Sequence, residues 1–563
     1  WCGVLSMKLN RRQAVVGMTS ALLAPAACAQ LREQTFSTEV FAHGVASGDP
    51  DTDSVVLWTR VSGQASEISV GWMVATDPQM REPVASGSAT TSALRDFTVK
   101  VLASGLPPGQ VLYYRFDAAG DISPVGRTRT LPTGRLDQLV IAVASCSNYP
   151  FGRFNGYQAI ADDADVDVVV HLGDYLYEYG DDGYGADDGR RLGRNHEPSH
   201  ETVTLADYRQ RHAQYKSEPG SLALHAMHAL IPTWDDHEST NNPWSGGAQN
   251  HQPGEGVWQD RRSISLRAYY EWMPVREPGF GEPPESRRAH FRFGDLASLY
   301  TVETRHLARS EQIELSEHSE ALETAESAAE FYQRVVGAQH RRMISASDAS
   351  FLAAGLTSSV REGQPWRILA NQTILARVVA PRLDDPVFEA ATQGLDEGSR
   401  DLVRSLAKFG EIALAGNMDA WDGYPAARER LYDLVERAGA NDLLVITGDT
   451  HMFWQNRLLR DNGKPVGVEL GTSGITSPRP FMQLGSVATT RYDELIAAQN
   501  AGVDWVDGRR RGFIKLTLRR EEARADFMGL STIETRNFST QTVRSTRIVR
   551  RDGTLQYSPT ATG

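Results

Sequence analysis

The chain has 563 residues, of which 40% are hydrophobic and 23% are charged, an ordinary composition for a globular protein of more than one domain. Its formal net charge of −13 argues against a nucleic-acid-binding protein that works by neutralising phosphates, because no excess of cations is present. Beyond the first 29 residues, no apolar run is long enough to span a membrane. The balance of charge instead suits either a protein that holds cations or one whose charge serves solubility alone.

The N-terminal segment has the pattern of an export signal. Arg11 and Arg12 precede an apolar, alanine-rich run, and a site of small residues ends at Ala29. Together these features predict a twin-arginine signal peptide over residues 1–29, with the twin-arginine translocation machinery as a partner and a periplasmic or secreted mature protein. The alternative is a lipoprotein anchor at Cys28, which ranks second because a proline lies three positions before it.

Short alternating runs between turn signals fill the next part of the chain. In order, these runs are 54–60, 68–74, 97–102 and 111–116. Their spacing predicts a small all-β antiparallel sandwich of the immunoglobulin or fibronectin type III kind over residues 38–132. No cluster of ligand-type side chains lies in this region, so we interpret it as an accessory domain.

Over residues 137–545, apolar strands alternate with helical stretches, which predicts an α/β domain. The clearest helix is 205–215, with Thr204 as its N-cap. The glycine- and charge-rich segment 180–200 is either a surface loop or the lining of a substrate mouth. Residues 546–563 are predicted to be a C-terminal tail.

Five apolar strands of this domain are followed by residues of the types that bind metals. The residues after the five strands are Cys146, Asp174 with Tyr177, Asp235 to His237, Asn371, and Asp449 with His451. Because ligands collect at the carboxyl ends of strands in open α/β sheets, these side chains are expected to meet. Once the signal is removed, Cys146 is the only cysteine, so it cannot form an intramolecular disulfide. The sequence therefore predicts a metal centre built from several strand ends.

A further strand, 296–302, is followed by Arg305. A guanidinium matches the geometry of a phosphate, so Arg305 could bind an anionic substrate. A structural salt bridge is an equally good interpretation of this residue.

Taken in chain order, these motifs resemble those of the alkaline phosphatase D family. The motifs are Gly44 to Pro50, Ser145-Cys146, Gly173 to Glu178, Trp234 to Glu238, Asn371-Gln372, Trp421 to Pro425 and Gly448 to His451. The resemblance extends from about residue 41 to about residue 530. It implies a metallophosphoesterase-type fold, with two mixed sheets sandwiched between helices behind the small β domain.

The resemblance also implies ferric iron and calcium as the metals. The implied iron ligands are Cys146, Asp174, Tyr177 and His451, with Asp174 bridging to the second metal. The implied calcium ligands are Asp236 and Asp449, with Asn371 as a possible further ligand. The chemistry agrees with this division, because thiolate, phenolate and imidazole suit iron and carboxylates suit calcium.

The implied activity is hydrolysis of phosphomonoesters, and of phosphodiesters as well, by metal-activated water. His237 would protonate the leaving oxygen, or else serve only as a hydrogen-bonding neighbour of the ligands. A dedicated phosphodiesterase or phospholipase D-type lipid hydrolase, acting on a phospholipid rather than a small phosphate ester, is the first alternative. A non-catalytic calcium- or phosphate-binding periplasmic protein is the second.

Overall fold

The computed structural model describes residues 39–63, 66–279, 281–479 and 484–558. The predicted twin-arginine signal and Cys28 lie outside these ranges and stay predictions. Within the described ranges, no helix combines the length and the apolar character needed to cross a membrane.

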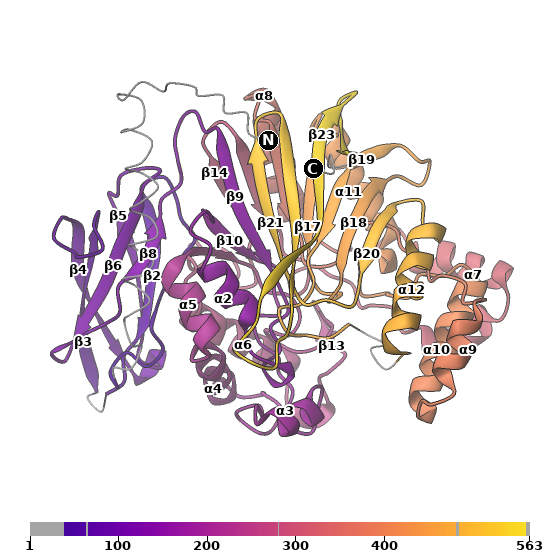
Figure 1. The fold of residues 1–563 in the computed structure, drawn as a ribbon, viewed down its shortest axis with the longest axis horizontal. Helices are drawn as coiled ribbons and strands as arrows, with labels where there is room; N and C mark the ends of the chain where they lie inside the picture. The colour runs from indigo at the N-terminus through magenta and orange to yellow at the C-terminus, as the bar shows by residue number, and fades with distance from the viewer. Residues whose placement is uncertain (1–38, 64–65, 280, 480–483, 559–563) are drawn as a thin grey trace, which may run out of the picture.

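Two mixed β-sheets pack face to face at the centre of the molecule (Figure 1). The larger has ten strands in the order β24 (Thr554–Ser558), β23 (Thr540–Arg551), β22 (Glu522–Leu530), β21 (Gly512–Arg519), β9 (Gln138–Ala144), β10 (Val168–His171), β11 (Ala229–Pro232), β1 (Val45–Gly48), β2 (Ser54–Arg60) and β5 (Thr98–Ser104). The smaller has seven strands in the order β14 (Ala289–Phe293), β15 (Ala297–Thr301), β16 (Trp366–Ala370), β17 (Leu443–Thr447), β19 (Pro465–Gly471), β18 (Phe453–Leu459) and β20 (Val503–Asp507).

The middle of each sheet is parallel. Strands β9, β10 and β11 run in one direction in the larger sheet, and β15, β16, β17 and β19 do so in the smaller. All of these strands are buried on both faces, as their continuous β-branched and aliphatic runs predict. The predicted two-sheet core is therefore confirmed, and the carboxyl ends of the parallel strands come to one edge of the sandwich.

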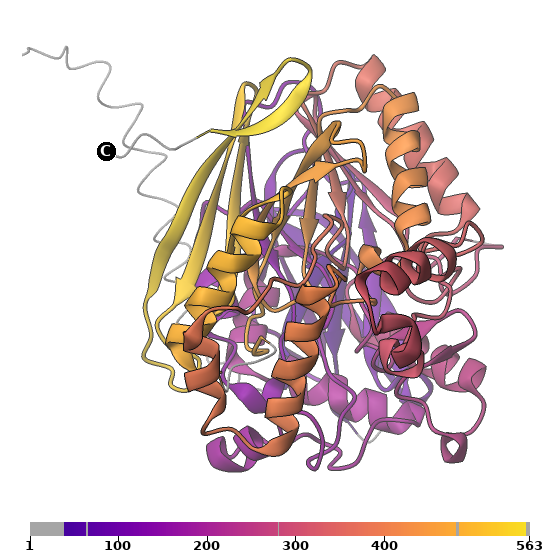
Figure 2. The same ribbon diagram turned by 90° about the vertical axis from the view of Figure 1, so that its right-hand side faces the viewer.

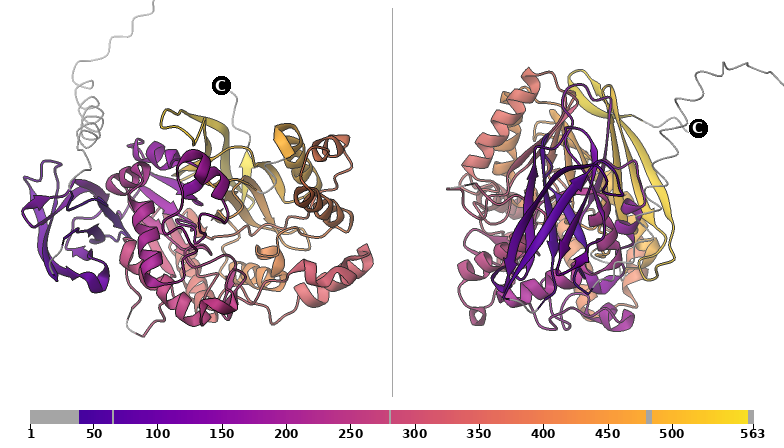
Figure 3. Two further views of the ribbon diagram at one scale, coloured as in Figure 1. Left: turned by 90° about the horizontal axis from the view of Figure 1, so that it is seen from below. Right: turned by 90° about the vertical axis from the view of Figure 1, so that its left-hand side faces the viewer.

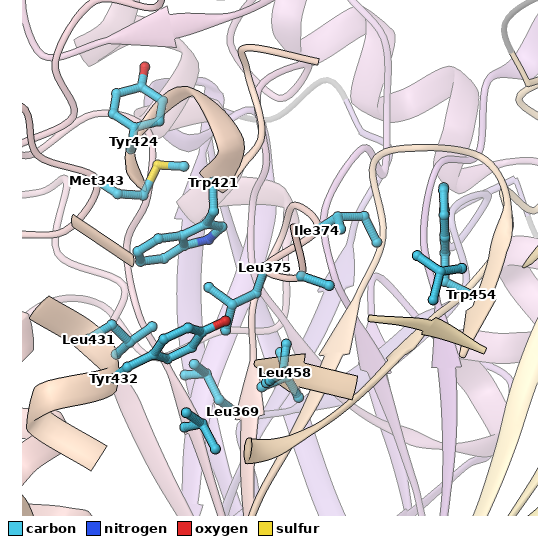
Figure 4. Packing of buried hydrophobic residues seen from close by; sticks show 14 of the residues in the cluster. Met343, Leu369, Ile374, Leu375, Trp421, Tyr424, Leu431, Tyr432, Trp454 and Leu458 are labelled. Atoms are coloured by element: carbon cyan, nitrogen blue, oxygen red, sulfur yellow. The ribbon is translucent and has the colours of Figure 1, made fainter. Parts of the chain in front are cut away.

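Helices cover the outer face of each sheet. The larger sheet is covered by α2 (Asn155–Ala161), α4 (Leu205–Lys216), α5 (Pro219–Met227) and α6 (Trp258–Trp272). The smaller sheet is covered by α8 (Ala346–Arg361), α11 (Pro425–Arg437) and α12 (Gly485–Gln499). Figure 4 shows how Leu431 and Tyr432 of α11 pack with Leu369 of β16 in this second core. At the start of α4, Thr204 and Asp207 form a capping box, which confirms the predicted N-cap.

Smaller elements lie around this sandwich. The segment 180–200 contains α3 (Ala186–Leu192). The short strands β12 (Pro243–Trp244) and β13 (Gly247–Ala248) form a hairpin after β11. Helices α7 (Ala325–Phe331), α9 (Pro386–Thr392) and α10 (Glu397–Glu411) lie at the opposite end of the molecule from the N-terminal strands (Figure 3).

The N-terminal strands form two layers. The outer layer contains β3 (Glu67–Ala75), β4 (Pro83–Ser92), β6 (Val111–Ala118), β7 (Asp121–Ile122) and β8 (Gly126–Arg129). It packs on β2 and β5 around a shared apolar core. However, β1 pairs in parallel with β11, so the inner layer is continuous with the ten-stranded sheet. The predicted boundary at residues 132–137 is thus not a boundary of the sheet, because pairing between β1 and β11 is non-local and leaves no local signal.

The prediction of a C-terminal tail from residue 546 is wrong as far as residue 558. Strands β23 and β24 pair as a hairpin at the edge of the large sheet, drawn in yellow in Figure 2. Ile548 is fully buried and Leu555 is 3% exposed, so the segment contributes to the core rather than fraying. Residues 559–563 lie outside the described ranges.

Candidate metal centre

The chain turns sharply just after the carboxyl ends of β9, β10 and β17. Cys146, Asp174, Asp449 and His451 have φ angles of 60°, 54°, 63° and 57°, all in the left-handed region. Residues other than glycine rarely adopt this conformation, and such strain concentrates at functional sites. Here it turns each side chain out of its strand direction and toward the same edge of the sandwich.

Three overlapping groups of potential metal-binding side chains meet at this edge. They are Cys146 with Asp174 and His451, Asp174 with Asp236 and His237, and Asp235 with Asp236 and Asp449. Within each group, the ligand atoms all lie within 4.8 Å of one another. Asp174 belongs to two groups, which is the arrangement expected of a carboxylate that bridges two neighbouring cations.

Tyr177 belongs to the same side of the centre as Cys146. Its Oη lies 3.0 Å from Oδ2 of Asp174 and 3.2 Å from Nε2 of His451. Ser477 donates a hydrogen bond of 2.7 Å to Oη of Tyr177. Six of the seven predicted ligands are therefore close together: Cys146, Asp174, Tyr177, Asp236, Asp449 and His451.

The electrostatics of this cluster fit a site that holds cations. Burial, with the Asp174 carboxylate nearby, raises the pKa of the Cys146 thiol well above its usual value. Burial and Asp236 raise the pKa of Asp174 in the same way. Within the described part of the chain, one carboxylate oxygen each of Asp174, Asp235 and Asp236 has no hydrogen-bond partner although it is buried. Bound cations would satisfy these oxygens and stabilise the ionised forms.

Neighbouring groups orient the ligands. Nδ1 of His451 lies 2.7 Å from the carbonyl oxygen of Pro478, so its other nitrogen, Nε2, faces the centre. Glu238 accepts hydrogen bonds from the backbone N–H groups of Asp174 and Asp235, at 3.1 and 2.8 Å. Glu238 thereby ties together the two loops that follow β10 and β11.

His237 lies between a buried glutamate and the metal-ligand group. Its Nδ1 is 2.7 Å from Glu178, its Nε2 is 3.8 Å from Asp236, and its ring stacks on Tyr177 at 4.1 Å. Burial disfavours the charged imidazole, but the surrounding Asp236 and Glu178 carboxylates outweigh burial and raise the pKa of His237 well above its usual value. Asn250 also donates a hydrogen bond of 2.9 Å to Glu178.

Arg305 is fully buried beside the centre, and the structure shows the salt bridges that were one of its two predicted roles. It makes structural salt bridges, through Nε to Asp235 at 2.5 Å and through Nη1 to Asp419 at 2.7 Å. Its Nη2 has no hydrogen-bond partner among the described residues. That nitrogen lies 3.8 Å from Asp236 and 3.7 Å from Asp449, so a donor remains directed at the centre.

Asn371 differs from the other predicted ligands. Its Oδ1 accepts a hydrogen bond of 3.2 Å from the indole of Trp421, and its Nδ2 donates to the carbonyl of Thr373. These contacts use one lone pair of Oδ1 and one N–H of Nδ2, and the ligand role of Asn371 stays a prediction. Conversely, Glu178 contacts His237 and Asp235 groups with Asp236 and Asp449, although the sequence patterns assign neither residue a role. Each is adjacent in sequence to a residue that those patterns do assign.

A sandwich of two mixed sheets with these donors at one edge defines the class of metal-dependent phosphoesterases. The fold resembles that of a purple acid phosphatase from yellow lupin (Lupinus luteus) seeds, with a TM-score of 0.51, 12% identity, and coverage of 90% of this chain and 74% of that one. At this identity the likeness concerns the fold alone.

The chain belongs to the PhoD-like phosphatase family, whose model matches residues 141–527. A second model, "PhoD-like phosphatase, N-terminal domain", matches residues 26–132. The chain is 32% identical over 508 residues to alkaline phosphatase D of Bacillus subtilis (strain 168), covering 87% of this chain and 78% of that protein. It is also similar to a solved structure of PhoD, with a TM-score of 0.75, 30% identity and 94% coverage of both chains. It is accordingly a phosphoric ester hydrolase.

Proposed function

We propose that the protein hydrolyses phosphomonoesters and phosphodiesters at an iron–calcium centre. The observation that carries this proposal is the position of Asp174, shared between a group that contains the Cys146 thiol and a group that contains Asp236 and His237. Cys146, Tyr177 and His451 offer thiolate, phenolate and imidazole, which suit ferric iron. Asp236 and Asp449 offer the hard oxygen ligands that calcium prefers.

The side chains around the centre have distinct parts in the reaction. When bound, two neighbouring cations lower the pKa of water and neutralise charge on phosphoryl oxygens. Nη2 of Arg305 would bind a phosphoryl oxygen, and the salt bridges of its other nitrogens with Asp235 and Asp419 support this role. Glu178 holds Nδ1 of His237, which leaves Nε2 to deliver a proton to the departing alcohol oxygen. The products are then a phosphate, or a phosphomonoester, and a neutral alcohol.

Metal analysis combined with a visible spectrum tests the ligand assignment. We expect iron and calcium in the wild-type protein, with an absorption band from thiolate or phenolate donation to iron. Cys146→Ala and Tyr177→Phe should each weaken the band and lower the iron content. Tyr179→Phe is the matched control, because this neighbouring phenol also lies near His237 but is not an assigned ligand. Hydrolysis by a protein that lacks iron would refute the assignment while leaving the phosphoesterase activity standing.

Comparison of a simple aryl phosphomonoester with the corresponding diester tests the substrate range. We expect turnover of both substrates, with rates that differ by less than a few orders of magnitude. Turnover of diesters alone would instead favour the dedicated phosphodiesterase or lipid-hydrolase hypothesis. The non-catalytic hypothesis is not retained, because the chain belongs to a family of phosphatases.

We also propose export through the twin-arginine machinery to the periplasm or the exterior, on the basis of Arg11, Arg12 and the small-residue site at Ala29. Replacing both arginines with lysine should retain the protein inside the cell. Lipid labelling of wild type and Cys28→Ser distinguishes a cleaved signal from a lipoprotein anchor.

A further inference from the structure

A cavity of about 380 Å³ opens directly beside the metal centre. Asp449 and His451 are among the residues that line it, so a molecule bound at the metals would reach into it. This volume lies within the range of pockets that bind small organic groups. The cavity is therefore continuous with the reaction site rather than a separate feature of the fold.

The walls of this cavity are largely apolar and come from distant parts of the chain. Ile374 and Val379 follow β16, Leu406 lies on α10, Trp454 lies on β18 and Ile496 lies on α12. Ile374 and Trp454 lie on the opposite side of the hydrophobic cluster from Tyr432 (Figure 4). The indole N–H of Trp454 is already bonded to Thr450 at 2.8 Å, so the ring offers its apolar surface.

The charged residues that line the cavity are neutralised by protein partners. Asp422 pairs with Arg428 at 2.6 Å, and Arg479 pairs with Asp493 at 2.9 Å. Asp419 is held by Arg305 in the same way. Away from the metal ligands, the cavity therefore selects by shape and apolar contact rather than by charge.

We propose that this cavity binds the organic group of the phosphate ester, and that the enzyme prefers esters of apolar alcohols. The inference rests on the proposed phosphoesterase function and specifies its substrate class. The phosphoryl group would lie at the metal centre, and the aliphatic or aromatic part of the alcohol would lie against Ile374, Leu406 and Trp454. Hydrolysis adds water across the bond between phosphorus and the alcohol oxygen, and the alcohol leaves with a proton.

The test is a series of n-alkyl phosphates from ethyl to octyl, assayed with the metal-loaded full chain. The leaving alcohols have nearly the same pKa, so the intrinsic reactivity is constant along the series. We expect kcat/KM to rise by about threefold for each added methylene until the cavity is filled. The dissociation constants of the corresponding alkyl phosphonates, which cannot be hydrolysed, should fall along the same series.

Two substitutions assign the effect to this cavity. Gly416 lines it, and a Cβ built there would lie 4.0 Å from Leu406, so Gly416→Leu should fill the space. We expect this change to lower the octyl-to-ethyl ratio of kcat/KM by at least tenfold. Gly394→Leu is the matched control, because a Cβ there meets nothing within 4 Å and the residue does not line the cavity.

Val379→Thr is the second variant, because it keeps the shape of the side chain and adds a hydroxyl. It should reduce the dependence on chain length, whereas Val487→Thr on the exposed side of α12, where Val487 is 70% exposed, should not.

If ethyl and octyl phosphate are hydrolysed equally well, the apolar preference is refuted while the proposed function stands. If the preference survives both cavity variants, the assignment to this cavity is refuted. If no phosphate ester is hydrolysed, both proposals fail.

Discussion

His237 has a buried carboxylate on one ring nitrogen and the metal-ligand group on the other. If it acts as a general acid, its removal should matter most when the leaving alcohol is a poor one. We expect His237→Ala to lower kcat by about 10²- to 10⁴-fold for an alkyl phosphate and by much less for a nitrophenyl phosphate. The measurement is kcat for both substrates, with metal content determined on the same samples.

Metal content separates a general-acid role of His237 from a role as a metal ligand. A protein in which His237→Ala removes a metal and slows both substrates equally would show that His237 is a ligand, as its grouping with Asp174 and Asp236 allows. Glu178→Gln is the companion variant, since its amide oxygen can still accept from Nδ1. It should retain more activity than Glu178→Ala.

Asp449 illustrates the stability cost of the centre. Burial and the nearby Asp235 raise its pKa well above the usual range, and its φ of 63° is left-handed. Asparagine tolerates this backbone conformation and carries no charge. We therefore expect Asp449→Asn to increase the free energy of unfolding of the metal-free protein by about 1–2 kcal/mol while lowering activity. Urea denaturation in the presence of a chelator checks this, and a less stable variant would contradict it.

The residue types at the strand ends were predictable from sequence, but the groups that orient them were not. Cys146, Asp174 and His451 each follow an apolar run within a few residues. The partner of His451 is the carbonyl of Pro478, and backbone carbonyls carry no sequence signal. Asn371 also follows a strand, and the hydrogen bond that its oxygen accepts from Trp421 has no counterpart in the sequence pattern.

Among the elements, the hairpin of β23 and β24 shows how much one buried residue contributes to the sheet edge. Ile548 is fully buried in the apolar core between the two sheets. We expect Ile548→Ala to lower the free energy of unfolding by about 2–4 kcal/mol through lost burial and the cavity that remains. The exposed Arg551→Ala on the same strand should change it by less than about 0.5 kcal/mol. Equal effects of the two substitutions, measured by thermal or urea unfolding, would show that the hairpin does not contribute to the cooperative core.

The strands were predictable where apolar runs were long, and less so where they were polar. Strand β10 is uniformly aliphatic before its final histidine, whereas β23 is rich in threonine and arginine, a composition that predicts an exposed tail. The sequence nevertheless contains a signal for the hairpin of β23 and β24. Asp552 and Gly553 both have positive φ angles, 51° and 75°, in the Asp-Gly turn that commonly joins two antiparallel strands.

At the scale of the whole molecule, the junction between the N-terminal strands and helices α4, α5 and α6 buries several basic side chains. Lys216 lies over the rings of Trp58 and Tyr175, at 4.8 and 5.2 Å, and 3.0 Å from Nε2 of His225. His212 stacks on Trp272, and neither of its ring nitrogens has a hydrogen-bond partner among the described residues. Burial, followed by the nearby Lys216, lowers the pKa of His212 well below its usual value.

This junction predicts a loss of stability in acid. A histidine whose folded-state pKa is lowered is neutral in the native protein, so its contribution is complete above about pH 6.5 and is lost as pH falls toward the folded-state pKa. Each such histidine therefore lowers the free energy of unfolding at pH 5 relative to pH 8. We expect His212→Phe to be stabilising at pH 5 relative to its effect at pH 8. An identical effect of the substitution at both pH values, measured by urea denaturation, would contradict this.

The pairing of β9 with β21 also constrains the order in which the molecule can form. Strand β9 lies between β10, which follows it closely in sequence, and β21, which begins at Gly512. Strand β1 likewise pairs with β11, far along the chain. A growing chain could therefore not complete the large sheet until nearly all of it had been synthesised. Native pairings of such wide sequence separation make folding slow, so the unfinished sheet would expose its edges longer than in a protein with mostly local contacts.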